Sequence, residues 1–487
     1  MKKTLLVLSL AFYYLTVSSC SENVSMNSIP YEMDGEPLPT ETGVSRAILN
    51  LNRSMAITDS AMAHYFTGDN MSMSRYFNPV TKSLSTEVGS VWMYTSAIEA
   101  VNSVMQSLND LKEIEPQLYE DNYSRYQELL SRLYDGLDYY RGTYTLTSYT
   151  QTKDWSVYAV DRANEKGTAD VTGVLNVYDD QEWLIRELLR SYKVTGNEDY
   201  LQKAEYLTDY VLDGWDCYPD ENGNEIGGIT WGPGYVTKHS CSNGPLISSL
   251  VWLYDIYSDK DAQITYREID PQLQRKEVTE KKSVYYLEFA KKIYNWQKQH
   301  LIMDSGVYYD LIGASAESPQ YEIIDGVNYR KGLSLTQPSG NAYTYNSGTM
   351  LSGSSELYKI TGEDTYLSDA SKLSDVSFST FAKKDVDVPG YYSFPIDGFS
   401  TWFNDVLLRG YIDAQSIGVN ASVAIDSYQA NLDYAWAKYR RSGLLPVNLL
   451  LGWNISYANN NVEAMFSFSY ASEYAMLAHS IMSNMNK

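Results

Sequence analysis

A thirteen-residue segment occurs twice in the chain and restricts its fold more than any other feature. The two copies are YKVTGNEDYLQKA, Tyr192 to Ala204, and YKITGEDTYLSDA, Tyr358 to Ala370. In each copy a Thr-Gly pair ends one helical pattern and another begins soon after, because glycine adopts the left-handed conformation that closes a helix. YLEFA at 286–290 echoes the second half, so the period is 86 and then 80 residues. The repeating unit is therefore a helical hairpin with a long loop on its other side.

The rest of the chain also follows helical periodicity, with apolar residues recurring every three to four positions. The expected helices span residues 43–66, 87–108, 121–141, 179–194, 198–213, 243–257, 283–301, 347–361, 364–381, 401–417, 422–441 and 460–484. No region shows a sustained alternating strand pattern. Twelve helices make six hairpins, and the period is too long for a solenoid of 34-residue repeats. We therefore expect an all-α fold, an (α/α)6 barrel in which inner and outer helices alternate.

The N-terminus has the features of an exported lipoprotein. Two lysines precede an apolar stretch from Leu5 to Val17 that is too short for a good membrane span. Ser18-Ser19-Cys20 then resembles a bacterial lipobox, in which the chain is cut before a cysteine that becomes lipidated. An ordinary signal peptide that happens to contain a cysteine is the alternative. We expect a signal peptide at 1–19, a flexible tether at 20–40 and a single domain at 41–487, anchored to the outer membrane through Cys20.

The charge of the chain limits its partners. Lys and Arg number 38 against 61 Asp and Glu, a formal net charge of −23. Such a surface repels nucleic acid and polyanionic glycans, so we expect a neutral ligand, no nucleic acid and a monomeric protein. Cys217 and Cys241 would either pair in an oxidising compartment or stay reduced, and the sequence leaves both possibilities open.

Three long loops rich in glycine, asparagine and aromatic residues precede expected inner helices. They are GGITWGPGYVTKHSCSNG at 227–244, QPSGNAYTYNSG at 337–348 and PGYYSFPIDGFSTWFND at 389–405. Long loops on a rigid scaffold often carry binding and catalytic residues. Because each precedes an inner helix, we expect the three loops to meet on one face of the barrel and to form a site there.

Asp179 and Asp180 stand together where the fourth helix begins. One interpretation is structural: Asp179 caps the helix, Glu182 completes a capping box, and Asp180 complements the helix dipole. The other is chemical. Two carboxyl groups roughly 5–5.5 Å apart can hydrolyse a glycosidic bond with retention, one as an ionised nucleophile and the other as a protonated acid. Repulsion between the two would keep the second proton in place.

Tyr178-Asp179-Asp180, followed by Trp183, resembles the signature of glycoside hydrolase family 76, the bacterial α-1,6-mannanases. Further blocks resemble the family in the same order: GGITW at 227–231, Lys238 with Ser242-Asn243-Gly244, YTYNSG at 343–348 with LYKITGEDTYLSDA after it, and FNDVLLRG at 403–410. The resemblance covers about residues 85–480. It implies an (α/α)6 barrel and a retaining, endo-acting enzyme without metal or cofactor, whose substrate is α-mannan or manno-oligosaccharides.

The resemblance also implies roles for single residues. Asp179 would be the nucleophile and Asp180 the general acid/base. The residues expected to bind substrate are Trp231, Asn243, Tyr343, Tyr345, Asn346 and Gln181. The chain departs from the family pattern at Gln181, where asparagine is common, and at Thr230, where a second aromatic residue is common. Trp183 is expected to pack in the core and Lys238 to be solvated.

Other functions have less support. The four histidines, His64, His239, His300 and His479, are not spaced as metal ligands, and no nucleophile elbow, phosphate loop or dinucleotide fingerprint occurs. The main alternative is a non-catalytic glycan-binding outer-membrane lipoprotein of a polysaccharide uptake system, although such proteins are built on 34-residue helical repeats. An unsaturated-uronide hydrolase would need basic groups to hold a carboxylate, which the acidic balance of the chain does not favour.

Overall fold

The computed structural model describes residues 38–487 except 271, 457–458 and 486–487. The expected signal peptide at 1–19, the expected lipidation site Cys20 and the tether up to residue 37 lie outside the described residues. Within the described part, none of the helices is both long enough and apolar enough to cross a lipid bilayer.

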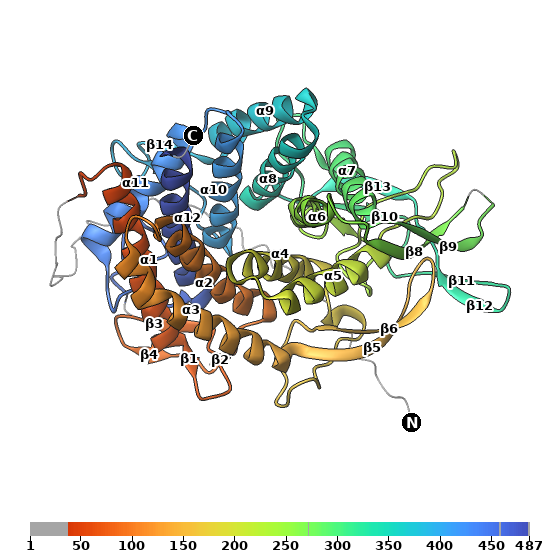
Figure 1. Cartoon of the computed structure of the whole chain (residues 1–487), viewed down its shortest axis with the longest axis horizontal. Coiled ribbons are helices and arrows are strands. Elements are labelled where there is room, and N and C mark those ends of the chain that lie inside the picture. Colours follow the sequence, from red (N-terminus) through yellow and green to blue (C-terminus); the bar gives the residue numbers. More distant parts are fainter. Residues whose placement is uncertain (1–37, 271, 457–458, 486–487) are drawn as a thin grey trace. The chain divides into compact units, whose positions relative to one another are not determined.

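Twelve α-helices occur in the described residues, one for each predicted helix, with ends that differ by a few residues (Figure 1). They are α1 (Gly43–Tyr65), α2 (Val91–Leu111), α3 (Pro116–Leu137), α4 (Tyr178–Thr195), α5 (Glu198–Asp213), α6 (Gly244–Tyr257), α7 (Lys282–Leu301), α8 (Thr344–Thr361), α9 (Asp364–Phe381), α10 (Ser400–Ser416), α11 (Ser422–Tyr439) and α12 (Ala464–Met485). Their number and order confirm the helical pattern read from the sequence.

The even-numbered helices form a closed inner ring. Each packs against the next, from α2 through α4, α6, α8 and α10 to α12, and α12 packs back against α2. The odd-numbered helices lie outside them: α3 packs on α2, α5 on α4, α7 on α6, α9 on α8, α11 on α10, and α1 along α12. Five hairpins of consecutive helices and the pair of α1 with α12 thus surround one axis, which is the predicted (α/α)6 barrel (Figure 1).

The repeated Thr-Gly pairs end two of the inner helices. Gly196 after α4 has φ 71° and its N–H donates to the Tyr192 carbonyl. Gly362 after α8 has φ 66° and its N–H donates to the Tyr358 carbonyl. Both are left-handed helix ends, and they explain why the motif recurs in the sequence.

Small residues bring the inner helices close together. A Cβ atom on Gly348 of α8 would lie 2.5 Å from the Val406 carbonyl oxygen of α10, so only glycine fits this contact. On the other side of the ring, the Ser54 hydroxyl of α1 donates to the Ala471 carbonyl of α12 at 2.6 Å. The Ser107 hydroxyl of α2 donates to the Ala475 carbonyl at 2.8 Å. Buried serine hydroxyls thus bond the backbone of α12 on both flanks.

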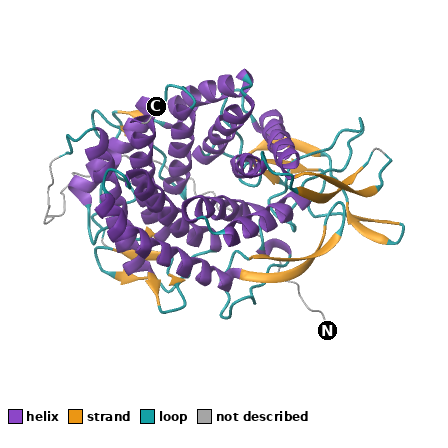
Figure 2. Ribbon diagram, in the orientation of Figure 1, coloured by secondary structure: helices purple, strands orange, loops and turns teal. Residues whose placement is uncertain are grey.

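Short strands outside the helices form hairpins and small sheets, which the sequence analysis did not predict (Figure 2). The longest hairpins pair β5 (Arg141–Thr147) with β6 (Thr152–Tyr158) and β8 (Gln263–Ile269) with β9 (Arg275–Lys281). Shorter ones are β1 (Phe66–Thr67) with β2 (Ser72–Met73), β11 (Tyr321–Ile324) with β12 (Val327–Arg330), and β14 (Lys383–Lys384) with β15 (Tyr392–Ser393). Two three-stranded sheets join β16 (Val462–Glu463), β3 (Tyr76–Asn78) and β4 (Ser83–Leu84), and β13 (Leu335–Ser339), β10 (Leu311–Ala314) and β7 (Lys238–His239).

Exposure explains why strand β9 was missed. β9 reads RKEVTEK, and most of its side chains are exposed, so it lacks the alternation of apolar and polar residues that a half-buried strand shows. Strand β6 does bury Trp155 and Val157, but this alternation covers too few residues to stand out in the sequence.

Candidate functional site

The two adjacent aspartates lie in the first turn of α4. The helix begins at Tyr178, and Val177 precedes it without a side-chain cap, so the expected capping box of Asp179 and Glu182 is wrong. The Tyr178 N–H donates to the Trp231 carbonyl at 2.8 Å, which fixes this helix start against the loop at 227–244. Asp179 is partly exposed and Asp180 retains 6% of its surface. Both side chains therefore lie near the N-terminal mouth of the inner ring.

The two carboxyl groups differ in acidity. Burial raises the pKa of Asp179 to about 6, and the nearby Cys241 thiol, the backbone amides at the helix start and the Trp231 indole limit that rise. Burial and then the charge of Asp179 raise the pKa of Asp180 well above its ordinary value. The shifts therefore favour ionisation of Asp179 before Asp180.

A third carboxyl group lies one turn further along α4. Glu182 is fully buried, and neither of its carboxyl oxygens has a hydrogen-bond partner among the described residues. Burial and the charge of Asp179 raise its pKa well above the ordinary value. Glu182 is thus a buried carboxyl group whose ionisation is disfavoured. The interpretation of Glu182 as part of a capping box did not predict this.

The glycine-rich loop at 227–244 is held by buried polar side chains. Asn243 is 0% exposed, and its amide donates to the Ile229 and His239 carbonyls and accepts from the Ile229 N–H. Lys238 is 2% exposed and binds Asp216 at 2.8 Å and the Gly227 carbonyl, so the expectation of a solvated lysine is wrong. The geometry of Asn243 argues against the sugar contact expected of it, because its hydrogen-bonding groups are used within the loop.

Trp231 is the loop residue best placed to meet a ligand. Its ring is partly exposed and stacks on His239 with centroids 5.0 Å apart, and Tyr235 packs at 4.6 Å. Because the indole N–H already acts on the Asp179 carboxyl, Trp231 contributes its partly exposed ring face to the site.

The remaining predicted binding residues differ in how exposed their side chains are. Tyr343 is partly exposed at the start of α8 and stacks on Tyr345, with ring centroids 6.1 Å apart. Tyr345 is buried and donates to Asp310 at 2.9 Å. Asn346 is fully buried and donates to the Tyr308 carbonyl, although its Oδ1 has no partner in the described residues. Of these three, Tyr343 is the one open to a ligand.

The side chain of Gln181 also hydrogen-bonds within the protein. It is fully buried, its amide donates to the Tyr158 carbonyl at 2.8 Å, and its carbonyl accepts from the Tyr158 N–H at 3.2 Å. These bonds argue against the substrate contact expected of it. They tie α4 to strand β6 and so help to position the neighbouring aspartates.

Aromatic side chains from four inner helices meet near the start of α4. Trp402 of α10 packs edge-on against Trp183 of α4 at 4.8 Å and Trp92 of α2 at 5.2 Å. Phe403 of α10 lies 4.7 Å from Tyr345 of α8. All belong to the first two turns of their helices, so these contacts show that the helix starts converge. The expected core position of Trp183 is confirmed, since it is buried.

Sequence reasoning did not assign Asp310 and Cys241 to the site. Both are partly exposed, and their charge interactions with Tyr345 and Asp179 bring them into the same neighbourhood. Asp310 follows α7 without any recognisable motif, so only the fold reveals it.

Cys241 and Cys217 are both free thiols, so of the two possibilities that the sequence left open, the structure has the reduced pair. No group of three His, Cys, Asp or Glu side chains in the described residues is arranged to hold a metal ion.

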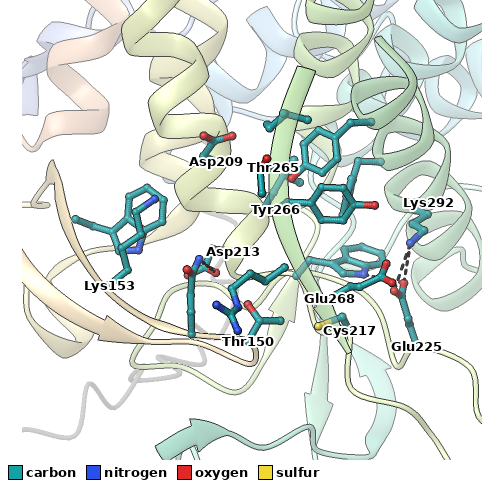
Figure 3. Close-up of a pocket in the computed structure, with 18 residues that line it drawn as sticks. Thr150, Lys153, Asp209, Asp213, Cys217, Glu225, Thr265, Tyr266, Glu268 and Lys292 are labelled. Atoms are coloured by element: carbon teal, nitrogen blue, oxygen red, sulfur yellow. Dashed lines mark hydrogen bonds and ion pairs between the residues drawn. The ribbon is translucent and has the colours of Figure 1, made fainter. Parts of the chain in front are cut away.

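A separate pocket of about 90 Å³ lies beneath the β8–β9 hairpin, between it and helices α5 and α7 (Figure 3). Asp209 and Asp213 of α5 line it, and the ion pair of Lys292 with Glu225 closes one side. Ligand pockets usually enclose about 300–1,000 Å³. This pocket is too small for a sugar chain and does not contain the aspartate pair.

Comparison with known proteins agrees with this geometry. A family model described as Glycosyl hydrolase family 76 matches residues 276–411, a segment that includes Tyr343 and Tyr345 but not α4. No curated protein matches the chain significantly.

Solved structures share the fold over most of the chain. A family 76 glycoside hydrolase from a bovine Bacteroides thetaiotaomicron strain is 20% identical, with TM-score 0.64 over 88% of this chain and 77% of that one. A family 76 mannosidase from Bacteroides thetaiotaomicron is 19% identical, with TM-score 0.63 over 90% and 100%. An inactive variant of an α-1,6-mannanase from Salegentibacter sp., changed at two adjacent aspartates and bound to α-1,6-mannotetrose, is 19% identical, with TM-score 0.59 over 88% and 99%.

The fold and the site define an (α/α)6-barrel protein with paired carboxyl groups at the mouth of its inner ring. Residues 276–411 match the family 76 model, and most of the chain shares its fold with solved structures of family 76 enzymes.

Proposed function

We propose that the chain is a retaining glycoside hydrolase that cleaves α-1,6-mannosidic linkages within α-mannan. The observation that carries the proposal is the division of protonation between the neighbouring carboxyl groups of Asp179 and Asp180 at a partly open helix mouth. Similar structures include α-1,6-mannanases, one of them inactive when two adjacent aspartates are replaced. Attack within the chain, as opposed to its ends, rests on the family resemblance.

In this mechanism Asp179, the ionised group, attacks the anomeric carbon of the mannosyl unit while Asp180 donates its proton to the departing glycosidic oxygen. The bond to the leaving sugar breaks as the Asp179 ester forms. Asp180, now a carboxylate, then takes a proton from water, and the hydroxide attacks the anomeric carbon and releases Asp179. Two inversions give net retention of configuration.

The surroundings of the pair suit a neutral substrate. Trp231 and Tyr343 offer partly exposed ring faces on which a sugar ring can stack. Asp310 adds another carboxyl group near the mouth, which would repel an anionic sugar. The net negative charge of the whole chain also disfavours an anionic substrate.

The test is product analysis on linear and branched α-1,6-linked mannan. The parent should release manno-oligosaccharides, and proton NMR of the first products should show the α-anomer. Asp179→Asn and Asp180→Asn should each reduce release by at least ~10³-fold with unchanged circular dichroism, since each group acts directly in bond cleavage. Full activity of either variant would refute the assignment.

The alternative, a non-catalytic glycan-binding lipoprotein, makes a different prediction. It requires binding of manno-oligosaccharides, measured by titration calorimetry, with no products after long incubation. The closed ring of hairpins is not the array of 34-residue repeats on which that expectation was based.

We also propose that the mature protein is anchored to the outer membrane by lipid on Cys20. The support is the sequence pattern at residues 17–20. Metabolic labelling with a palmitate analogue should mark the parent and not Cys20→Ala. Labelling of both proteins alike, or of neither, would contradict lipidation at this residue.

A further inference from the structure

A second cavity lies on the axis of the inner ring, far along the helices from the aspartate pair. It encloses about 400 Å³ and is lined by residues from all six inner helices. Its residues on α4 are Arg186, Arg190 and Lys193, which follow Asp180 by six to thirteen positions. At about 1.5 Å per residue this places them roughly 9–20 Å further along the helix axis. The cavity therefore lies at the opposite end of the barrel from the proposed active site.

Cations dominate the lining of this cavity in an otherwise acidic protein. Five arginine and lysine side chains face three carboxylates: Arg186, Arg190, Lys193, Lys359 and Arg409 against Asp255, Glu356 and Asp413. Three of the cations are neutralised by close partners, Arg190 by Glu187 at 3.1 Å, Lys359 by Glu356 at 2.8 Å and Arg409 by Glu99. Two cations, Arg186 and Lys193, remain.

Arg186 is the anomalous group. It is 7% exposed, yet its guanidinium makes no hydrogen bond within the described part of the chain, and Nε is buried without a partner. Its nearest carboxylate oxygen, on Glu187, is 3.8 Å away and already accepts from Arg190. A buried guanidinium normally has bonded partners for its five donors, because an unpaired buried charge is costly. Arg186 Nε therefore lacks a partner in the described chain, and the side chain lines the cavity, where a ligand can reach it.

Lys193 adds a second cation beside the first. Its Nζ lies 3.8 Å from the centroid of the Trp252 ring, and the Arg186 guanidinium lies 4.8 Å from the same ring. No carboxylate within the described residues forms an ion pair with Lys193. The helix dipole favours a lysine in the last turn of α4, but it does not explain Arg186 in the middle of the helix. Two like charges sharing one indole are best stabilised by an anion bound near both.

The nearby carboxylates do not fill this need. Asp413 accepts from the Ser352 hydroxyl at 2.6 Å, and Asp255 is exposed on α6. Neither forms an ion pair with Arg186 or Lys193 in the described residues. A tetrahedral oxyanion can accept several N–H bonds at once, and arginine matches its geometry with paired donors.

We propose that this axial cavity binds a phosphate or sulfate group through Arg186 and Lys193, with Trp252 as its wall. The ligand is either the free inorganic ion or the same group carried as an ester on a sugar. Its site is separate from the aspartate pair, so binding does not depend on hydrolysis of mannan.

Titration calorimetry with inorganic phosphate and with sulfate tests the proposal, at constant ionic strength maintained with sodium chloride. The parent chain should bind one ion per molecule. Lys193→Gln should weaken binding at least ~10-fold, since it removes one charge-assisted contact. The matched control is Lys372→Gln, which removes an exposed lysine of the outer helix α9 and should bind as the parent does.

A second variant, Arg186→Gln, should abolish the binding heat, with circular dichroism confirming that the helices remain. Because Lys193 is solvent-accessible, Lys193→Gln keeps the test decisive even if Arg186→Gln does not fold. Mannose 6-phosphate binding more tightly than inorganic phosphate would identify the esterified group as the ligand, and weaker binding would identify the free ion. No ion-specific heat in the parent, or equal affinity in Lys193→Gln and Lys372→Gln, would overturn the proposal.

Discussion

Glu182 lies one helical turn from Asp179 on the same face of α4, fully buried, with no hydrogen-bond partner for either carboxyl oxygen in the described chain. Three carboxyl groups thus occur within four residues, and burial raises the pKa of each. The pKa of Asp179 rises to about 6, and those of Asp180 and Glu182 rise well above their ordinary values. Burial therefore disfavours more than one negative charge at this helix start.

Glu182→Gln should stabilise the protein at neutral pH. In the unfolded chain the carboxyl ionises as pH rises through its ordinary pKa of 4.5, whereas in the folded chain it stays protonated. Rising pH therefore lowers the free energy of unfolding until the folded pKa is reached. The variant should exceed the parent by about 1–3 kcal/mol at pH 7 and match it near pH 4.

Urea unfolding at pH 4, 5.5 and 7 measures this difference. Glu128→Gln, on the exposed face of α3, is the matched control and should not show the trend. A Glu182→Gln advantage that stays constant with pH would show that Glu182 is not held neutral in the folded chain.

The activity of the proposed hydrolase should follow a bell-shaped pH profile. Asp179 must be ionised, so kcat/KM should rise as pH increases through about 6. Asp180 must be protonated, so kcat/KM should fall as pH passes its higher pKa. The two limbs belong to the coupled pair. Initial rates on linear mannan between pH 4 and 9 provide the measurement, and an optimum below pH 5 would contradict the assigned protonation states.

Trp402 should be essential for the shape of the helix mouth. Its ring packs against Trp92 and Trp183, and its N–H donates to Glu99 at 3.3 Å. Trp402→Ala should lower the free energy of unfolding by about 3–5 kcal/mol, because it opens a cavity among these rings. Trp402→Phe keeps an aromatic ring and should lose roughly half as much. Equal losses in urea unfolding would mean that the lost Glu99 hydrogen bond, and not ring packing, dominates.

Gly228 should tolerate no side chain. Its φ is 76°, and a Cβ atom there would lie 2.4 Å from the Trp296 ring. Gly228→Ala should therefore lower the free energy of unfolding by more than ~2 kcal/mol and displace the loop that carries Trp231. Gly196 has a similar φ of 71° with open space around it, so Gly196→Ala should cost only about 1 kcal/mol. Thermal unfolding compares the two, and similar losses would show that backbone conformation alone limits Gly228.

The helices and their alternation were predictable because a repeated Thr-Gly helix end and apolar stripes both leave traces in sequence. The adjacent aspartates were equally visible. The sequence could not show that Gln181 and Asn243 hydrogen-bond within the protein, because an amide that bonds a loop and one that bonds a sugar are the same residue type. Asp310 carries no motif and joins the site only through folding. Lys238 was misjudged because its buried partner, Asp216, lies 22 residues away and no local pattern pairs them.

The closure of the ring by α12 affects how the protein must be made. Ser54 and the Ala471 carbonyl, bonded across that seam, are 417 residues apart in sequence. During synthesis the earlier helices have two open flanks until α12 emerges, and contacts of such separation form slowly. α1 therefore reaches its partner only when α12 is present, and a chain truncated before α12 would leave the flanks of α1 and α2 exposed to aggregation.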